Sequence, residues 1–395
     1  MSKRFSNCTA AAVLTAVLGL ASAGSIAQTQ GVSANEVVIG TISDLSGPIA
    51  GYGKDLRNGM LLRVDEINAQ GGVHGRKLKL LVEDNGYDPK RSVLAAQKLV
   101  NQDKVFAVIG TFGTVHTLAA MQVQAPKGVY NLFPMSLSRE MYEPVDHLKF
   151  ALLSPYFDQL EAVIPPLYKS TQARKACAIY QDDDFGYEVV QGAEAGLRKA
   201  GAQLAEKTSF KRGATDFSSQ VARLKAADCD FVVTATLIRE TVSVITEARK
   251  IGFSPTFVSP SSAYTDLIPK LGGKAMDGFY AAMTAVHPYP DDASEAVRNW
   301  TARYQAKFTD LPTVFSTYGY TMIDLFAKGL QKNGPQLTGD SYGRALESIG
   351  ELPSDIFGNP PLLFTPTQHL GSNKARLSQL QNGRWKIVLD YDQFK

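Results

Sequence analysis

Three segments of the sequence combine glycine, hydroxyl and other small side chains in a way that suits a small polar ligand. They are residues 43–53, residues 110–117 and residues 134–138. Each follows an apolar run that we expect to form a buried strand, so the three loops would meet at one edge of a sheet. Backbone N–H groups and hydroxyls beside a helix N-terminus can hold a carboxylate. Caps of ordinary turns are the alternative for any one loop, but three loops in register favour binding.

The sequence contains few motifs that are typical of catalytic sites. The segment 47–54 looks like a phosphate loop, but its spacing is wrong and Asp55 stands where a Ser or Thr belongs. Thr114 with His116 is the one nucleophile–base pair that can be named. The run Asp182-Asp183-Asp184 is predicted to be a solvated turn whose last Asp caps a helix. We expect no enzyme activity, no metal site and no cofactor.

The elements that must position these loops alternate between strand and helix. Residues 37–42 are predicted to be a strand, Leu56, Met60, Val64 and Ile67 recur at helical spacing, and residues 78–83 form the next strand. The same alternation restarts after residue 156, with strands at 176–181, 203–210, 230–236 and 256–259. The predicted fold class is α/β: two doubly wound parallel-sheet lobes joined by a hinge of several crossovers, with a ligand cleft between them.

The domain bounds follow from this pattern. Residues 35–152 with 284–356 are assigned to lobe 1, and residues 153–283 with 357–395 to lobe 2. Strands at 376–381 and 385–391 flank Asn382-Gly383, a strong hairpin signal.

The first 27 residues are predicted to be a cleaved signal peptide. Lys3 and Arg4 precede a small and apolar run, residues 10–20, which is too short to span a bilayer, and cleavage is expected near Ala23 or Ala27. An uncleaved anchor or a buried N-terminal helix is the alternative. We therefore expect a periplasmic protein. Cleavage leaves 39 of the 41 basic residues against 38 acidic ones, so no nucleic-acid partner is expected.

Two cysteines, Cys177 and Cys229, remain in the mature chain. Both lie in or beside predicted strands. A disulfide is one possibility, and two small buried free thiols on neighbouring strands are narrowly preferred.

Several motifs along the chain carry a family resemblance. They are Leu45-Ser46-Gly47-Pro48 with Tyr52-Gly53, Asp65-Glu66-Ile67-Asn68 with Gly71-Gly72-Val73-x-Gly75, Val108-Ile109-Gly110, Asp184-Phe185-Gly186 and Thr215-Asp216-Phe217-Ser218. In this order, behind a signal peptide, they resemble the leucine/isoleucine/valine-binding protein family, the type I periplasmic receptors of ABC importers.

The resemblance implies two lobes that close on a ligand, and it assigns site residues by position. Tyr52 would lie over the ligand, while Thr114 with the segment Met135, Ser136 and Leu137 would hold its carboxylate. On the second lobe Phe185 replaces a common tyrosine, and Leu237 also stands where a tyrosine is expected. Ser261 stands where amino-acid receptors of the family have the glutamate that pairs with the ligand's ammonium group.

The missing glutamate leaves an ammonium group without its charge partner, unless Tyr264 or Asp266 compensates. We therefore expect a ligand with a carboxylate and an apolar or aromatic part, which Phe112, Met135, Phe185 and Leu237 would contact. A core role is the alternative for Phe112 and Met135. The segment 181–186 is similar to the branch of the family associated with aromatic and other non-amino-acid carboxylates.

The expected function is delivery of this small-molecule carboxylate to the membrane permease of an ABC importer, with no covalent chemistry. A sensor module that reports its ligand state to a membrane receptor is the second hypothesis. A periplasmic amidase or hydrolase that uses Thr114 and His116 is the third.

Overall fold

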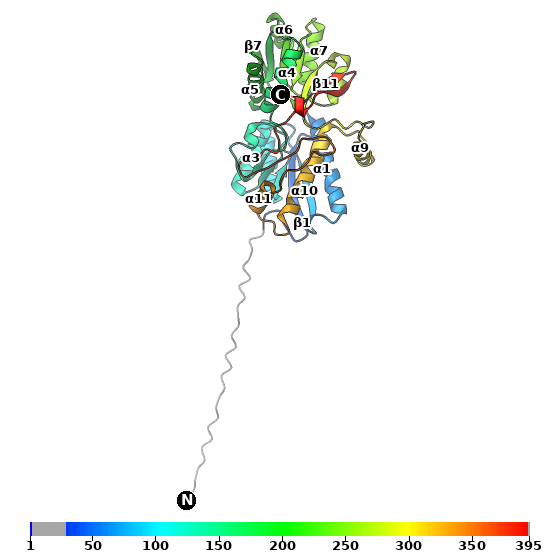
Figure 1. Cartoon of the computed structure of the whole chain (residues 1–395). Helices are drawn as coiled ribbons and strands as arrows, with labels where there is room; N and C mark the ends of the chain where they lie inside the picture. The colour runs from blue at the N-terminus through cyan, green and yellow to red at the C-terminus, as the bar shows by residue number, and fades with distance from the viewer. Residues whose placement is uncertain (2–28, 394–395) are drawn as a thin grey trace.

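Two β-sheets organise the chain, one in each of two lobes that lie one above the other (Figure 1). The structure is a computed structural model that describes Met1 and residues 29–393. The predicted signal peptide, apart from Met1, lies outside the described residues. No helix in the described part of the chain is both long and apolar enough to cross a membrane.

Lobe 1 is built on a five-stranded parallel sheet in the order β2-β1-β3-β4-β5. Its strands are β1 (Glu36–Ser43), β2 (Lys77–Asp84), β3 (Ala107–Ile109), β4 (Tyr130–Leu132) and β5 (Lys149–Phe150). The last of these is too short to have been predicted from the sequence. Its helices are α1 (Ala50–Ala69), α2 (Pro89–Gln97), α3 (Thr114–Gln124), α9 (Glu295–Phe308), α10 (Val314–Asn333) and α11 (Ser341–Glu347).

Both faces of the lobe 1 sheet are covered, as a doubly wound sheet requires. On one face Ile42 and Val108 pack with Ala96 of α2. On the other Ile39 and Ile109 belong to the large core cluster that includes side chains of α1 and α10. This two-sided burial explains the continuous apolar runs of the strands.

Lobe 2 is built on a seven-stranded sheet in the order β12-β11-β10-β9-β8-β6-β7. The strands are β6 (Ala176–Gln181), β7 (Leu204–Phe210), β8 (Phe231–Ala235), β9 (Thr256–Ser259), β10 (Tyr280–Met283), β11 (Arg376–Gln381) and β12 (Arg384–Leu389). The helices are α4 (Tyr156–Ser170), α5 (Asp184–Lys199), α6 (Ser218–Ala226), α7 (Ile238–Lys250) and α8 (Leu267–Gly272). The two-lobe α/β fold class is as predicted.

The C-terminal hairpin extends the lobe 2 sheet by antiparallel pairing of β11 with β10. At its turn Asn382 and Gly383 both have positive φ, 53° and 75°, as the sequence signal requires. Trp385 then packs on Tyr264 and Phe279 and donates its indole N–H to Thr265 O at 2.9 Å. The hairpin therefore completes the core of lobe 2.

The described chain passes between the lobes three times, after β5, after β10 and after α11. The first and third crossovers pair with each other, because Ala151 N–H donates to His369 O at 2.8 Å and Gly371 N–H donates to Ala151 O at 2.9 Å. Ser154 Oγ donates to Asn373 O at 2.8 Å. The residue bounds assigned to the lobes from the sequence stay a prediction.

The preference for free thiols is wrong, because Cys177 and Cys229 form a disulfide. Cys177 is the second residue of β6. Cys229 lies two residues before β8, which is the strand next to β6. Their Cα atoms are 6.0 Å apart, within the range that a disulfide spans. Neighbouring strands were expected, but the sequence does not show whether two cysteines on such strands lie close enough to bond.

Candidate functional site

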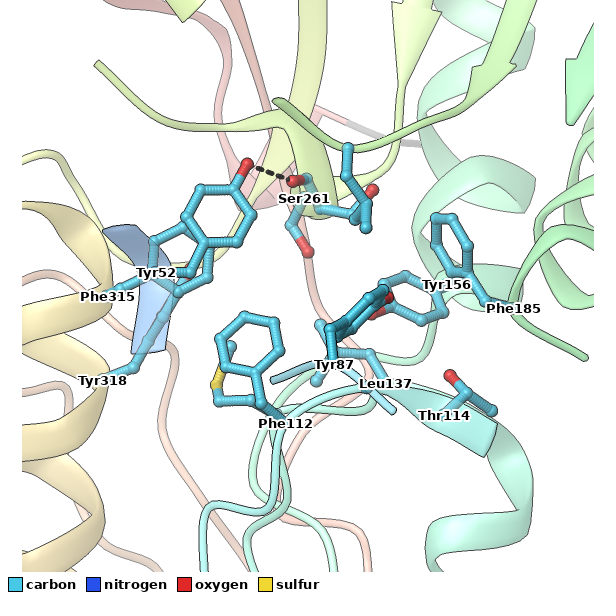
Figure 2. Close-up of a pocket in the computed structure, with 14 residues that line it drawn as sticks. Tyr52, Tyr87, Phe112, Thr114, Leu137, Tyr156, Phe185, Ser261, Phe315 and Tyr318 are labelled. Atoms are coloured by element: carbon cyan, nitrogen blue, oxygen red, sulfur yellow. Dashed lines mark hydrogen bonds between the residues drawn. The ribbon is translucent and has the colours of Figure 1, made fainter. Parts of the chain in front are cut away.

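A cavity lies between the two lobes. The space that no atom fills is about 440 Å³, a volume that includes open solvent at the entrance. Figure 2 shows side chains from both lobes pointing into it. The lining residues are Tyr52, Tyr87, Phe112, Gly113, Thr114, Met135, Leu137, Tyr156, Phe185, Leu237, Ser261, Ser262, Phe315 and Tyr318. Eight of the nine residues predicted for the site are among them, all except Ser136.

The loop between β1 and α1 places Tyr52 in the cavity. The Asp44 carboxylate accepts from Gly47 N–H at 2.5 Å and from Ile49 N–H at 2.8 Å, which folds the loop back on itself. Gly53 permits this turn, since a Cβ at that position would lie 1.9 Å from Asp44 O. Tyr52 is fully buried, and its hydroxyl donates to Ser262 O of the other lobe at 2.8 Å (Figure 2).

An aromatic wall stands on the lobe 1 side of the cavity. The ring of Tyr52 stacks on Phe315 at 4.0 Å between centroids and on Phe112 at 5.7 Å. Phe315 lies in the first turn of α10, which packs along α1. Three aromatic rings from distant parts of the sequence therefore form one apolar surface.

A polar corner lies at the N-terminus of α3. Gly113 precedes the helix with φ of 90°, a conformation that favours glycine, and Thr114 is the first helical residue. Ser136 Oγ donates to Thr114 Oγ1 at 3.0 Å. Ser136 is 1% exposed and lies behind Thr114, outside the lining of the cavity. The corner combines a hydroxyl with the partial positive charge of a helix N-terminus.

The lobe 2 wall is mostly apolar. Phe185 meets the edge of Tyr156, with ring centroids 5.1 Å apart. Leu237 precedes the first turn of α7. Ser261 follows β9, and Gln159 fixes it: the Gln159 amide donates to Ser261 Oγ at 3.0 Å and accepts from Ser261 N–H at 2.8 Å.

No Asp, Glu, Lys, Arg or His is among the residues that line the cavity. The two residues that were candidates to replace the missing glutamate lie elsewhere. Tyr264 is buried in the lobe 2 core, where its hydroxyl accepts from His287 N–H at 3.0 Å. Asp266 forms an ion pair with Lys270 on α8. The cavity presents hydroxyls, backbone groups and aromatic rings, and it offers no formal charge to a ligand.

His116 is buried and does not belong to the lining. Its ring stacks on Tyr87 at 4.1 Å between centroids. Burial lowers its pKa to about 4, so the imidazole is neutral at pH 7. Among the described residues no hydrogen bond joins His116 to the Thr114 hydroxyl. The pair named from the sequence therefore lacks the contact that a nucleophile and its base require.

The run Asp182-Asp183-Asp184 caps α5 one residue earlier than predicted. The Asp183 carboxylate accepts from Gly186 N–H at 3.3 Å and from Arg212 at 2.8 Å, whereas Asp184 is already helical. The described residues hold no group of three or more His, Cys, Asp and Glu side chains arranged for a metal ion.

Sequence reasoning missed six lining residues. They are Tyr87, Gly113, Tyr156, Ser262, Phe315 and Tyr318. Tyr87 had a usable signal, because it follows β2 at the same sheet edge as the predicted loops. Gly113 lies inside the loop 110–117 that was expected to bind, and Ser262 directly follows Ser261. Tyr156, Phe315 and Tyr318 depend on how the crossovers place α4 and α10 against the cleft, which local sequence does not reveal.

Comparisons with known proteins agree with this architecture. A family profile described as "Periplasmic binding protein" matches residues 36–384. An "Amino acid binding protein" from Pseudomonas aeruginosa is 28% identical over 60% of this chain, and the match covers 64% of its own length, slightly under two thirds. The "Leu/Ile/Val-binding protein" of Escherichia coli is 24% identical over 76% of this chain and 80% of its own.

Solved structures share the fold. A possible leucine/isoleucine/valine-binding protein from Rhodopirellula baltica superposes with a TM-score of 0.82 and 21% identity, over 91% of this chain and 98% of that one. A fatty acid ABC transporter substrate-binding protein from Thermomonospora curvata gives 0.83 and 21%, over 92% and 93%. A solute binding protein from R. palustris in complex with benzoate gives 0.78 and 16%, over 90% and 96%. With its two lobes, its interlobe cavity and a family match over most of its length, the chain belongs to the periplasmic binding proteins and is similar to the Leu/Ile/Val-binding proteins among them.

Proposed function

We propose that this protein is the periplasmic solute-binding component of an ABC importer and that its ligand is a small carboxylate with an apolar or aromatic body and no ammonium group. The observation that carries the proposal is the absence of any charged side chain from the lining of the interlobe cavity.

The lack of an acidic partner argues against an α-amino acid. An ammonium group enclosed between the lobes would lose its hydration, and Ser261 with its Gln159 partner supplies no negative charge in return. A buried cation without a counter-charge costs several kcal/mol, on the order of a hundredfold or more in affinity. A ligand without this group avoids that cost.

The polar corner supports a carboxylate at one end of the ligand. The hydroxyl of Thr114, backed by Ser136, and the first N–H groups of α3 are donors grouped at a helix N-terminus. From there the rings of Phe112, Phe315 and Phe185 provide an apolar enclosure for the rest of the molecule. The nine predicted residues would thus act together with Tyr87, Tyr156 and Tyr318 in binding.

Relatives with this fold take carboxylates of both kinds. The names of the curated relatives refer to amino acids. Of two structural neighbours, one is the substrate-binding protein of a fatty acid ABC transporter and the other is a solute binding protein in complex with benzoate. The fold therefore accommodates a carboxylate with or without an amino group, and the residues around the cavity decide between them.

Isothermal titration of the mature protein with leucine, valine, phenylalanine, benzoate and 4-hydroxyphenylacetate tests the proposal. We expect binding of one or both aromatic acids and at least about a hundredfold weaker binding of the amino acids. Phenylalanine is the matched control, since it carries an aromatic ring and a carboxylate together with the ammonium group. Tight binding of leucine or phenylalanine would contradict the argument from Ser261.

The sensor hypothesis uses the same cleft and differs in the membrane partner. Stimulation of a cognate permease by the loaded protein in proteoliposomes supports transport, whereas binding to a receptor ectodomain without transport supports sensing. Turnover of an ester or amide that disappears in the variant His116→Ala would overturn the binding-only proposal.

A further inference from the structure

Arg139 crosses from lobe 1 to lobe 2 at one rim of the cavity. It lies in the short helix Arg139–Met141, between β4 and β5. Its Nε donates to Glu188 Oε1 at 3.1 Å and its Nη2 donates to Gln191 Oε1 at 2.9 Å, both on α5 of lobe 2. The guanidinium also lies 4.2 Å from the ring centroid of Phe157 in α4. All three contacts join lobe 1 to lobe 2.

The same two segments line the cavity. Leu137 lies two residues before Arg139, and Phe185 lies nearly one turn before Glu188 on α5. A ligand that contacts both Leu137 and Phe185 would therefore also bring Arg139 close to Glu188.

Carboxylates from both lobes surround this contact. Glu140 and Glu143 lie on the lobe 1 side, and Asp158, Asp184 and Glu188 lie on the lobe 2 side. Burial raises the pKa of Asp158 to about 6; Glu161 of the same lobe and, to a lesser extent, Glu143 of lobe 1 raise it further, while Arg139 lowers it. Burial likewise raises the pKa of Asp184, with a further contribution from Glu140. Closure therefore brings like charges together along this rim.

The nearby lysines are engaged elsewhere. Lys149 donates to the carbonyl oxygens of Glu140 and Glu143, at 3.2 and 3.0 Å. Lys199 pairs with Glu161 at 3.3 Å. The guanidinium of Arg139 is the group that meets the buried carboxylate of Glu188, which is 7% exposed.

We propose that Arg139 is a positioning residue that latches the lobes in the closed form by neutralising Glu188 across the acidic rim, and that it sets the rate of ligand release without touching the ligand. The inference rests on the proposed solute-binding function. It adds to that function a residue outside the cavity.

The test compares Arg139→Ala with Arg63→Ala in the mature protein. Arg63 is a matched control, because it pairs with Glu66 and Asp324 and lies 5.3 Å from the Tyr320 ring, all within lobe 1. The probe is whichever of benzoate, 4-hydroxyphenylacetate and leucine the wild type binds. We expect Arg139→Ala to release the probe about tenfold faster or more, since closure then leaves the Glu188 carboxylate buried without a partner. Arg63→Ala should lower the melting temperature and leave the release rate within about twofold.

A double variant separates the latch from a general structural role. In Arg139→Ala/Glu188→Gln the uncompensated charge is gone, so the release rate should return most of the way toward that of the wild type. Equal release rates for wild type and Arg139→Ala, or no recovery in the double variant, would overturn the proposal.

Failure of the two ideas can be told apart. A wild type that binds leucine in place of benzoate contradicts the proposed ligand and leaves the latch testable with leucine. If the wild type binds none of the three probes, the latch is judged on the free proteins by small-angle scattering. Arg139→Ala must then give a larger radius of gyration than Arg63→Ala, and equal radii overturn the latch.

Discussion

Tyr52 is the side chain that joins the two halves of the site most directly. Its ring belongs to the lobe 1 aromatic wall, and its hydroxyl donates to Ser262 O of lobe 2 at 2.8 Å. Burial raises its pKa well above the ordinary value, so the hydroxyl keeps its proton at neutral pH and acts as a donor. The ring and the hydroxyl therefore have separable roles.

The variant Tyr52→Phe keeps the ring and removes the hydrogen bond. We expect ligand affinity to fall about fivefold to tenfold, since one buried hydrogen bond that forms on closure is lost and Ser262 O is left unpaired. Isothermal titration measures the change. Tyr130→Phe is the control, because Tyr130 donates to Gly339 O at 2.6 Å inside lobe 1. It should lower stability and leave affinity unchanged, and an equal loss of affinity in both variants would contradict this role for Tyr52.

At the level of single residues, the sequence was most informative for loops that directly follow strands. Tyr52, Thr114 and Met135 could be placed at one sheet edge because parallel strands deliver their carboxyl ends to the same side. Phe315 lies more than 260 positions from Tyr52 yet stacks on it. Such a contact is decided by the packing of α10 on α1, and no local pattern encodes it. Whether each of these residues binds ligand stays a prediction.

Among the elements, the loop between β1 and α1 depends on a second carboxylate, that of Asp84 at the end of β2. It accepts from Leu45 N–H at 2.9 Å, from Ser46 Oγ at 2.6 Å and from Gly86 N–H at 2.9 Å. Burial alone would raise its pKa, but these hydrogen bonds, with a smaller effect of Arg91, lower it to about 2. One side chain thus holds two loops of the sheet edge.

The variant Asp84→Asn tests this link. A lowered pKa stabilises the folded protein above the ordinary carboxyl value of 3.8, and the contribution is lost as the pH falls from about 4 to 2. We expect the variant to be less stable at pH 7 by about 1 kcal/mol, allowing for solvent screening. The difference should shrink near pH 2. Urea unfolding at both pH values measures it, and a constant difference would contradict the linkage.

Several strands were predicted well from their apolar runs alone. The strands Ala176–Gln181, Thr256–Ser259 and Arg376–Gln381 were predicted with the bounds that the structure has. The disulfide was not, because the distance between two cysteines on neighbouring strands is a tertiary property, which the pairing of β6 with β8 decides. A pattern that shows a strand does not show its register against the strand beside it.

At the scale of the whole molecule, the disulfide joins two neighbouring strands in the lobe 2 sheet. The C-terminal hairpin forms one end of the same sheet. The two cysteines are 52 positions apart in the sequence. Closing a loop of that size reduces the entropy of the unfolded chain, which raises the free energy of unfolding by roughly 4 kcal/mol. We expect the double variant Cys177→Ser/Cys229→Ser to melt at least several degrees lower in scanning calorimetry. Its ligand affinity should stay near that of the wild type, because neither cysteine lines the cavity. An unchanged melting temperature would contradict the stabilising role.

The position of the hairpin also constrains how the protein is made. Trp385 fills the lobe 2 core against Tyr264 and Phe279, side chains that leave the ribosome more than a hundred residues earlier. Until β11 and β12 (Figure 1) have been synthesised, β10 remains an unpaired edge and the core beside it stays open. Lobe 2 therefore cannot finish folding before residues 376–389 have left the ribosome. A chain that waits for these two strands keeps lobe 2 incompletely folded for most of its synthesis.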